Sequence, residues 1–295
     1  MDPPKQLPPF LRVPLEIRLD IYRLLLVDEP SEAEQTFNIN ALPEYYEYEK
    51  HTDLEDNGHN RVLSFRNANP QHFKLNLHQA SGKLRKAYMV RSGRFRAQCM
   101  DVTYNCVNVP DIDPTILRVN KQIHEEAARL LYTSYTFDFD TSTEAVIPFL
   151  EDLTPYSRSY IRRMSLVKKA IAYDKDFDRC EWQNMCRYVA KNLQLNDLDL
   201  GVVAGKPLQG ADLVTPIAEA DYPCLIATHK KDEMSWVRDL MEIKGLHRLD
   251  IRPCIEHCPP PQSNALMFFV AFSASVGLGF TDYLMKQMIV PPIVV

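Results

Sequence analysis

The feature that most constrains the fold is a stretch near the middle of the chain, residues 113–140, where a helical pattern runs directly into an alternating one. Asp113 followed by Pro114 is typical of a helix start, because a carboxylate caps the first free amides and proline loses no hydrogen bond there. Apolar residues then recur at steps of three and four, which predicts one buried helical face. They are Ile116, Val119, Ile123, Ala127, Leu130 and Leu131.

The polar residues of this predicted helix, including His124, Glu125 and Glu126, are expected on its solvated face. Replacing Glu126 by alanine should therefore change stability little, whereas a charge at Ile123 should destabilise the fold. From Tyr135 onward the period changes, and aromatic residues alternate with threonine and aspartate as far as Asp140. Such alternation predicts a strand with one apolar face.

A second pattern repeats downstream of this strand. The form L-x-x-L-x-L occurs at Ile161–Leu166, Leu195–Leu200 and Leu246–Ile251. Each occurrence follows a predicted helix, at residues 143–153, 180–193 and 232–243. Helix and strand units in series indicate parallel strands with helices packed on them. The form also resembles a degenerate leucine-rich repeat, and ordinary α/β packing without a solenoid remains the alternative.

The remaining chain supplies a first helix, an insertion and a last helix. The first helix is predicted at residues 13–27 and is apolar around most of its circumference, so it is either buried or wedged between its own domain and a partner. The sequence thus divides the chain into three regions: an N-terminal helical region (1–30), an acidic loop with an antiparallel β insertion (31–112), and a body (113–290) that packs with the first region. The fold class is mixed α/β. The strands of the insertion are expected at 62–65, 73–77, 87–90 and 102–107, and residues 202–231 are expected to form a long connection.

Composition narrows the class of protein. A formal net charge of −5 over 295 residues argues against a general nucleic-acid binder, which would be clearly basic. Seven cysteines and an N-terminus without a signal-peptide pattern favour reduced thiols in a cytoplasmic or nuclear protein. Residues 264–289 are expected to be a docked terminal helix, because serines and glycines interrupt the uncharged run; a membrane anchor is the alternative.

No catalytic constellation emerges. Cys254, His257 and Cys258 offer three zinc ligands, but no fourth cysteine or histidine lies at a recognisable spacing, so neither a metal nor a cofactor is expected. His124 lacks the second histidine one turn on that a zinc protease needs, and the sequence has no nucleophile elbow and no phosphate-binding loop. We therefore expect no enzymatic activity.

Two blocks carry a resemblance to a known family. The first, LRVPLEIRLDIYRLLL from Leu11 to Leu26, resembles the opening of an F-box, and the second, ILRVNKQIHEEA from Ile116 to Ala127, resembles its second half. Together they resemble fungal F-box-like proteins of poorly characterised function. The resemblance implies a substrate adaptor of a cullin–RING ubiquitin ligase, with a Skp-family subunit on the F-box helices and an unknown substrate protein on the C-terminal part. It places the partner contacts on Pro14, Leu15, Ile17, Ile21 and Tyr22.

A second interpretation keeps the fold and omits the ligase. A long insertion separates the two blocks, so the first helix could instead belong to the core of a structural scaffold. Exposure of the first helix distinguishes the two hypotheses: accessible apolar side chains favour a partner, and complete burial favours the scaffold.

Overall fold

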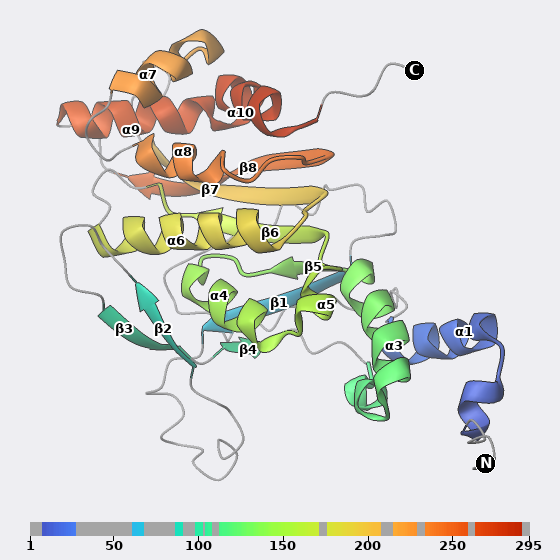
Figure 1. Ribbon diagram of the computed structural model, residues 1–295. Helices are drawn as coiled ribbons and strands as arrows, with labels where there is room; N and C mark the ends of the chain where they lie inside the picture. The colour runs from blue at the N-terminus through green and yellow to red at the C-terminus, as the bar shows by residue number, and fades with distance from the viewer. Residues whose placement is uncertain are drawn as a thin grey trace, which may run out of the picture.

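The computed structural model describes residues 8–27, 61–67, 86–90, 98–102, 104–107, 112–170, 176–207, 215–228, 234–258 and 263–290. Its centre is a six-stranded sheet in the order β4-β1-β5-β6-β7-β8 (Figure 1). The strands are β4 (Tyr104–Cys106), β1 (Arg61–Asn67), β5 (Tyr135–Asp138), β6 (Arg163–Lys168), β7 (Asp197–Pro207) and β8 (Arg248–Cys258). All neighbours pair in parallel except β4 and β1, which confirms the mixed α/β class.

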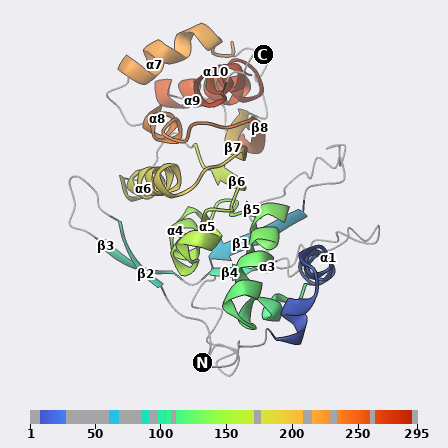
Figure 2. The same cartoon turned by 45° about the vertical axis from the view of Figure 1, so that its right-hand side comes forward.

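Helices line one face of this sheet. Figure 2 shows α4, α6 and α8 in one layer beside the strands. The helices between β5 and β8 on this side are α4 (Thr143–Asp152), the short α5 (Pro155–Arg158), α6 (Asp176–Asn192) and α8 (Ser235–Leu240). Met164, Leu198 and Leu249 lie opposite one another in the register of β6, β7 and β8, and all three are buried. The central leucine-type position of each L-x-x-L-x-L segment thus forms one buried row in parallel strands, as the pattern predicts.

The other face of the sheet carries charges. In the register of β6, β7 and β8, Arg163 lies beside Asp197 and Asp197 beside Arg248. Arg248 Nη2 donates to Asp199 Oδ1 at 3.1 Å, and burial raises the pKa of Asp199. Parallel sheets are usually apolar on both faces because helices cover both. The charged side chains therefore distinguish this sheet from a doubly wound one.

The central stretch forms two helices rather than one. The short 3-10 helix η5 (Pro114–Arg118) starts at Asp113, whose Oδ1 accepts from the backbone N–H of Thr115 at 3.0 Å. The chain is then extended at Asn120, whose Oδ1 accepts from the N–H of Ile123 at 2.9 Å and caps α3 (Lys121–Ser134). This break turns Val119 out to solvent, so its prediction as a buried residue is wrong. Ile123 is buried, as predicted.

The predicted β insertion is only partly a separate unit. The antiparallel hairpin of β2 (Lys86–Val90) and β3 (Gln98–Val102) stands apart from the main sheet. β1 instead joins the main sheet in parallel with β5, and β4 extends that sheet beyond β1. The predicted acidic loop and the strand predicted at 73–77 lie outside the described residues.

The C-terminal part is more ordered than the sequence suggests. β7 continues to Pro207, into the segment that we expected to be a connection, and β8 continues to Cys258. The predicted connection 202–231 contains η7 (Glu219–Asp221) and α7 (Tyr222–Thr228). The last helical segment is kinked: a π-helical turn η9 (Val276–Phe280) joins α9 (Asn264–Ser275) to α10 (Thr281–Met288), and within that turn Leu278 leaves helical geometry at φ −129° and ψ −115°. Within the described chain, Leu266–Met288 is the one helix long and apolar enough to cross a membrane by length and composition; here α9 packs on β7, and η9 and α10 pack on β8.

The first helix, α1 (Leu15–Leu26), lies at the far end of the molecule from α9 (Figure 1). A 3-10 turn, η1 (Pro9–Arg12), precedes it. Its main contacts are with α3 and η5, and its C-terminal end is tied to η5 by the N–H of Asp113, which donates to the carbonyl of Leu25 at 2.7 Å. α1 is therefore carried by the helices of the central stretch.

Candidate partner-binding surface

The inward face of α1 consists of residues spaced four apart. Arg18, Tyr22 and Leu26 lie on one side of the helix and are buried against α3 and η5. The ring of Phe10 from the preceding turn packs near the ring of Tyr22, with centroids 6.1 Å apart. An arginine thus occupies a position that an ordinary amphipathic helix would fill with an apolar side chain.

The carboxylate of Glu126 in α3 balances the positive charge of the buried Arg18. Its Oε2 accepts from Arg18 Nε at 3.0 Å, and its Oε1 accepts from Arg18 Nη2 at 2.6 Å, so the pair is bidentate. The hydroxyl of Tyr22 donates to Oε2 at 2.9 Å, and Gln122 Nε2 donates to Oε1 at 3.0 Å. Arg18 Nη1 also donates to the carbonyl of Val13 at 2.6 Å. These bonds join the two sequence blocks of the F-box resemblance.

Arg18 and Glu126 each stabilise the charged form of the other. Hydrogen bonding from Arg18 is the main reason that the pKa of Glu126 is lowered, and hydrogen bonding to Glu126 is the main reason that the pKa of Arg18 is raised. Burial, followed by the bond to Glu126, raises the pKa of Tyr22 to about 12. The side chains of Arg18 and Glu126 are only 7% and 17% exposed. The expectation that Glu126 faces solvent is therefore wrong, because Arg18 from a distant segment neutralises it.

The outward face of α1 carries a stripe of apolar side chains beside charged ones. Ile17 is 50% exposed and Leu24 is 79% exposed, with the half-buried Ile21 between them. Spacings of four and three place these three side chains on one stripe, opposite Tyr22. We call Ile17, Ile21 and Leu24 the α1 stripe. Beside it, Arg23 Nη1 pairs with Asp20 Oδ1 at 2.7 Å.

The five predicted contact residues divide between the two faces. Leu15, Ile17 and Pro14 are exposed and Ile21 is half-buried, so all four can be reached from solvent to some degree. Tyr22 is fully buried and bonded to Glu126, so in this structure it belongs to the core and not to a partner surface.

Leu24 was missed by the sequence analysis. The signal that could have found it is its spacing of three from Ile21 and seven from Ile17. The same spacing rule assigns Tyr22 to the opposite face.

A second polar contact at α3 could be mistaken for a catalytic pair. His124 Nδ1 lies 2.9 Å from the carbonyl of Leu117, and its Nε2 lies 3.4 Å from Ser157 Oγ. Ser157 is buried, and its Oγ also accepts from Thr154 Oγ1 at 2.9 Å at the start of α5. A nucleophile must be reachable by its substrate, so this serine and histidine serve to pack α5 on α3. The expectation that His124 faces solvent is therefore wrong.

Of the three candidate zinc ligands, the structure describes the side chain of one. Cys254 lies on β8 and is partly buried, and the side chains of His257 and Cys258 lie outside the described residues. Among the side chains that the structure does describe, no three of histidine, cysteine, aspartate and glutamate gather in a way that could hold a metal ion.

Comparisons with family models, with curated proteins and with solved structures gave no match to this chain.

Proposed function

We propose that this protein is a non-enzymatic protein-interaction module in which α1 docks on a partner protein. The observation that carries the proposal is the α1 stripe. It exposes large aliphatic side chains at i, i+4 and i+7 on a helix whose other face is fixed by a buried ion pair. A rigid helix with one apolar stripe facing solvent suits recognition by an apolar groove.

The partner that we propose is a Skp-family subunit of a cullin–RING ubiquitin ligase, which makes the protein an F-box-like substrate adaptor acting in the cytoplasm or nucleus. The two blocks that resemble an F-box lie together in space, joined by Arg18 and Glu126, which are 108 positions apart in the sequence. This contact supports their acting as one unit. The sheet supports a further part of the proposal, a degenerate leucine-rich-repeat-like body, because β1, β5, β6, β7 and β8 are parallel and follow one another in chain order. The substrate would bind elsewhere on the chain.

One observation favours a scaffold without a ligase. Tyr22, the aromatic residue of the F-box-like opening, lies in the core rather than on the stripe. In that case the fold is the same and the α1 stripe serves a different protein.

The test is a binding titration of the purified protein with the Skp-family subunit of the same organism. Replacing Ile17 and Leu24 by serine removes two exposed anchors, and a buried anchor at an interface is commonly worth about 2 kcal/mol, so binding should weaken at least about tenfold. Both side chains face solvent, so the melting temperature should stay within about 2 °C of the wild type.

The matched control is Glu16→Ser with Arg23→Ser, which changes two exposed positions of the same helix outside the stripe. It should bind as the wild type does. Absence of binding by the wild type at micromolar concentration would exclude the ligase and leave the scaffold. Equal weakening by both double variants would show that the stripe is not the contact.

A further inference from the structure

The described part of the chain has a second exposed apolar region, at the end opposite α1 (Figure 1). Met267 on α9 is 57% exposed and Leu278 on η9 is 59% exposed. α9 carries no charged residue. Large apolar side chains exposed on an uncharged helix are typical of a surface that another molecule covers.

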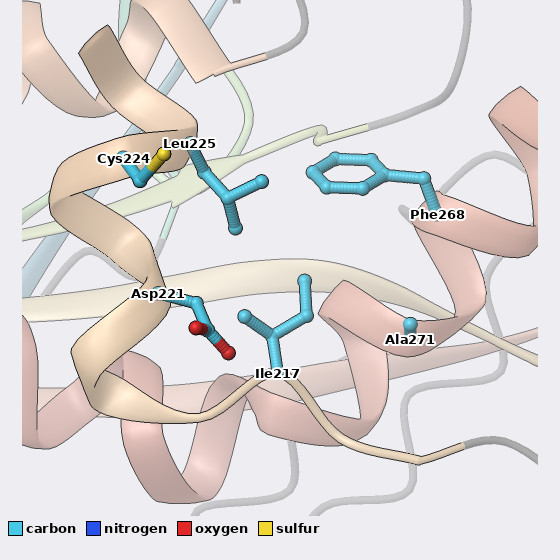
Figure 3. Close-up of a pocket in the computed structure, with 6 residues that line it drawn as sticks. All are labelled: Ile217, Asp221, Cys224, Leu225, Phe268 and Ala271. Carbon is cyan, nitrogen blue, oxygen red and sulfur yellow. The ribbon is translucent and has the colours of Figure 1, made fainter. Parts of the chain in front are cut away.

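A groove runs between this helix and α7. Its cavity volume is about 320 Å³, and it is lined by Ile217, Asp221, Cys224, Leu225, Phe268 and Ala271. Figure 3 shows Leu225 from α7, Phe268 from α9 and Ile217 from the segment before η7 pointing toward the same space. The carboxylate of Asp221 lies at the edge of that space. We call this space the α7–α9 groove.

The elements on either side of the groove are packed on one another. Tyr222 of α7 is buried, stacks on Tyr283 of α10 with ring centroids 5.4 Å apart, and exchanges a hydrogen bond with Ser275 of α9. The turn at Gly279 packs closely against the segment before η7, because a Cβ added there would lie 2.8 Å from the backbone nitrogen of Glu219. The groove is therefore part of the packed structure and needs no rearrangement to exist.

The carboxylate at the rim of the groove determines which charge a ligand should carry. Glu219 pairs with Lys286 at 2.6 Å, so its carboxylate is neutralised within the protein. Asp221 is exposed, and within the described ranges no lysine or arginine forms an ion pair with it. A lone carboxylate beside an apolar groove is complementary to a cation next to an apolar group.

We propose that the α7–α9 groove is a docking site for a segment of another protein that carries a large apolar side chain next to a lysine or arginine. The apolar side chain enters between Leu225 and Phe268, and the cation pairs with Asp221. This site is separate from the α1 stripe, and its test does not involve the proposed ligase partner. It gives the molecule docking surfaces at both ends.

The experiment is a selection of random twelve-residue peptides, displayed on phage, against the immobilised full-length protein. Enriched peptides should share a large apolar residue within two positions of lysine or arginine. Their affinity, measured by fluorescence anisotropy, should fall at least about tenfold in Asp221→Lys, which reverses the rim charge, and in Cys224→Arg, which crowds the groove. Both positions are exposed, so both variants should keep the wild-type melting temperature.

The matched control is Glu16→Lys, a charge reversal on an exposed position of α1, which should leave the affinity unchanged. Failure to enrich any peptide would overturn the proposal. Enriched peptides without a cation, or with equal affinity for the wild type and Asp221→Lys, would overturn it as well.

Discussion

Glu126→Ala is the change that most directly tests how α1 is attached. The carboxylate of Glu126 accepts hydrogen bonds from Arg18, Tyr22 and Gln122, so alanine leaves a buried guanidinium without its counter-ion. Breaking a buried ion pair from one side costs about 3–5 kcal/mol. Because Glu126 remains 17% exposed and Arg18 keeps its bond to the carbonyl of Val13, water and that bond reduce the cost. We expect the free energy of unfolding to fall by about 2–3 kcal/mol.

The assay is urea unfolding followed by circular dichroism at neutral pH, with Glu125→Ala as the matched control. Glu125 is the adjacent residue of the same helix, and its carboxylate lies 3.9 Å from the ammonium of an almost fully exposed Lys121. Such a surface pair is worth less than about 1 kcal/mol, so the control should change stability little. If the two variants unfold at the same urea concentration, the Arg18–Glu126 pair does not hold α1 in place.

The same pair predicts a dependence on pH. Arg18 lowers the pKa of Glu126 below its ordinary value of 4.5. A carboxyl group with a lower pKa in the folded state contributes stability that is present above the unfolded pKa and is lost as the pH falls through the folded pKa. The stability difference between the wild type and Glu126→Gln should therefore be largest near pH 6 and shrink as the pH is lowered below about 4.5. A difference that stays constant down to pH 3 would contradict the ionic character of the contact.

Two further changes probe the packing at either end of the molecule. Ile123→Asp places an unpaired charge at a buried position of α3 and should cost at least about 3 kcal/mol, whereas Lys121→Asp on its exposed side should cost little; equal melting temperatures would refute the assignment of faces. Gly279→Ala brings a Cβ within 2.8 Å of the backbone nitrogen of Glu219 and should cost about 1–3 kcal/mol by overpacking. Gly277→Ala, where a Cβ meets no atom within 4 Å, should change stability little, and thermal unfolding of the two variants measures the contrast.

Patterns that repeat within a short window predicted the architecture well. The alternation after Tyr135 predicted β5, and the L-x-x-L-x-L segments predicted β6, β7 and β8 as parallel strands with helices packed on them. These hydrophobic patterns depend only on residues that are neighbours along the chain. The pairing of β1 with β5 joins residues about 70 positions apart, and neither strand has a local sequence pattern that indicates its partner.

At the candidate site, too, local sequence patterns predicted only part of the structure. Periodicity shows which residues of α1 share a face, but not which face meets the rest of the protein. At two positions of α1 polarity and burial are reversed, since Arg18 is buried while Leu24 faces solvent. The reversal depends on Glu126, whose carboxylate makes burial of the guanidinium tolerable. A contact between two such distant segments cannot be deduced from helical period alone.

The separation of two faces on α1 has an evolutionary consequence. Arg18, Tyr22 and Leu26 are tied to α3 and η5, so substitutions there change the free energy of unfolding and are subject to selection on the fold itself. Ile17 and Leu24 contribute little to the core, so mutations there can accumulate without a cost in folding. Descendants of this sequence can therefore exchange one binding specificity for another on the outward side of a single helix, while the scaffold beneath it is inherited unchanged.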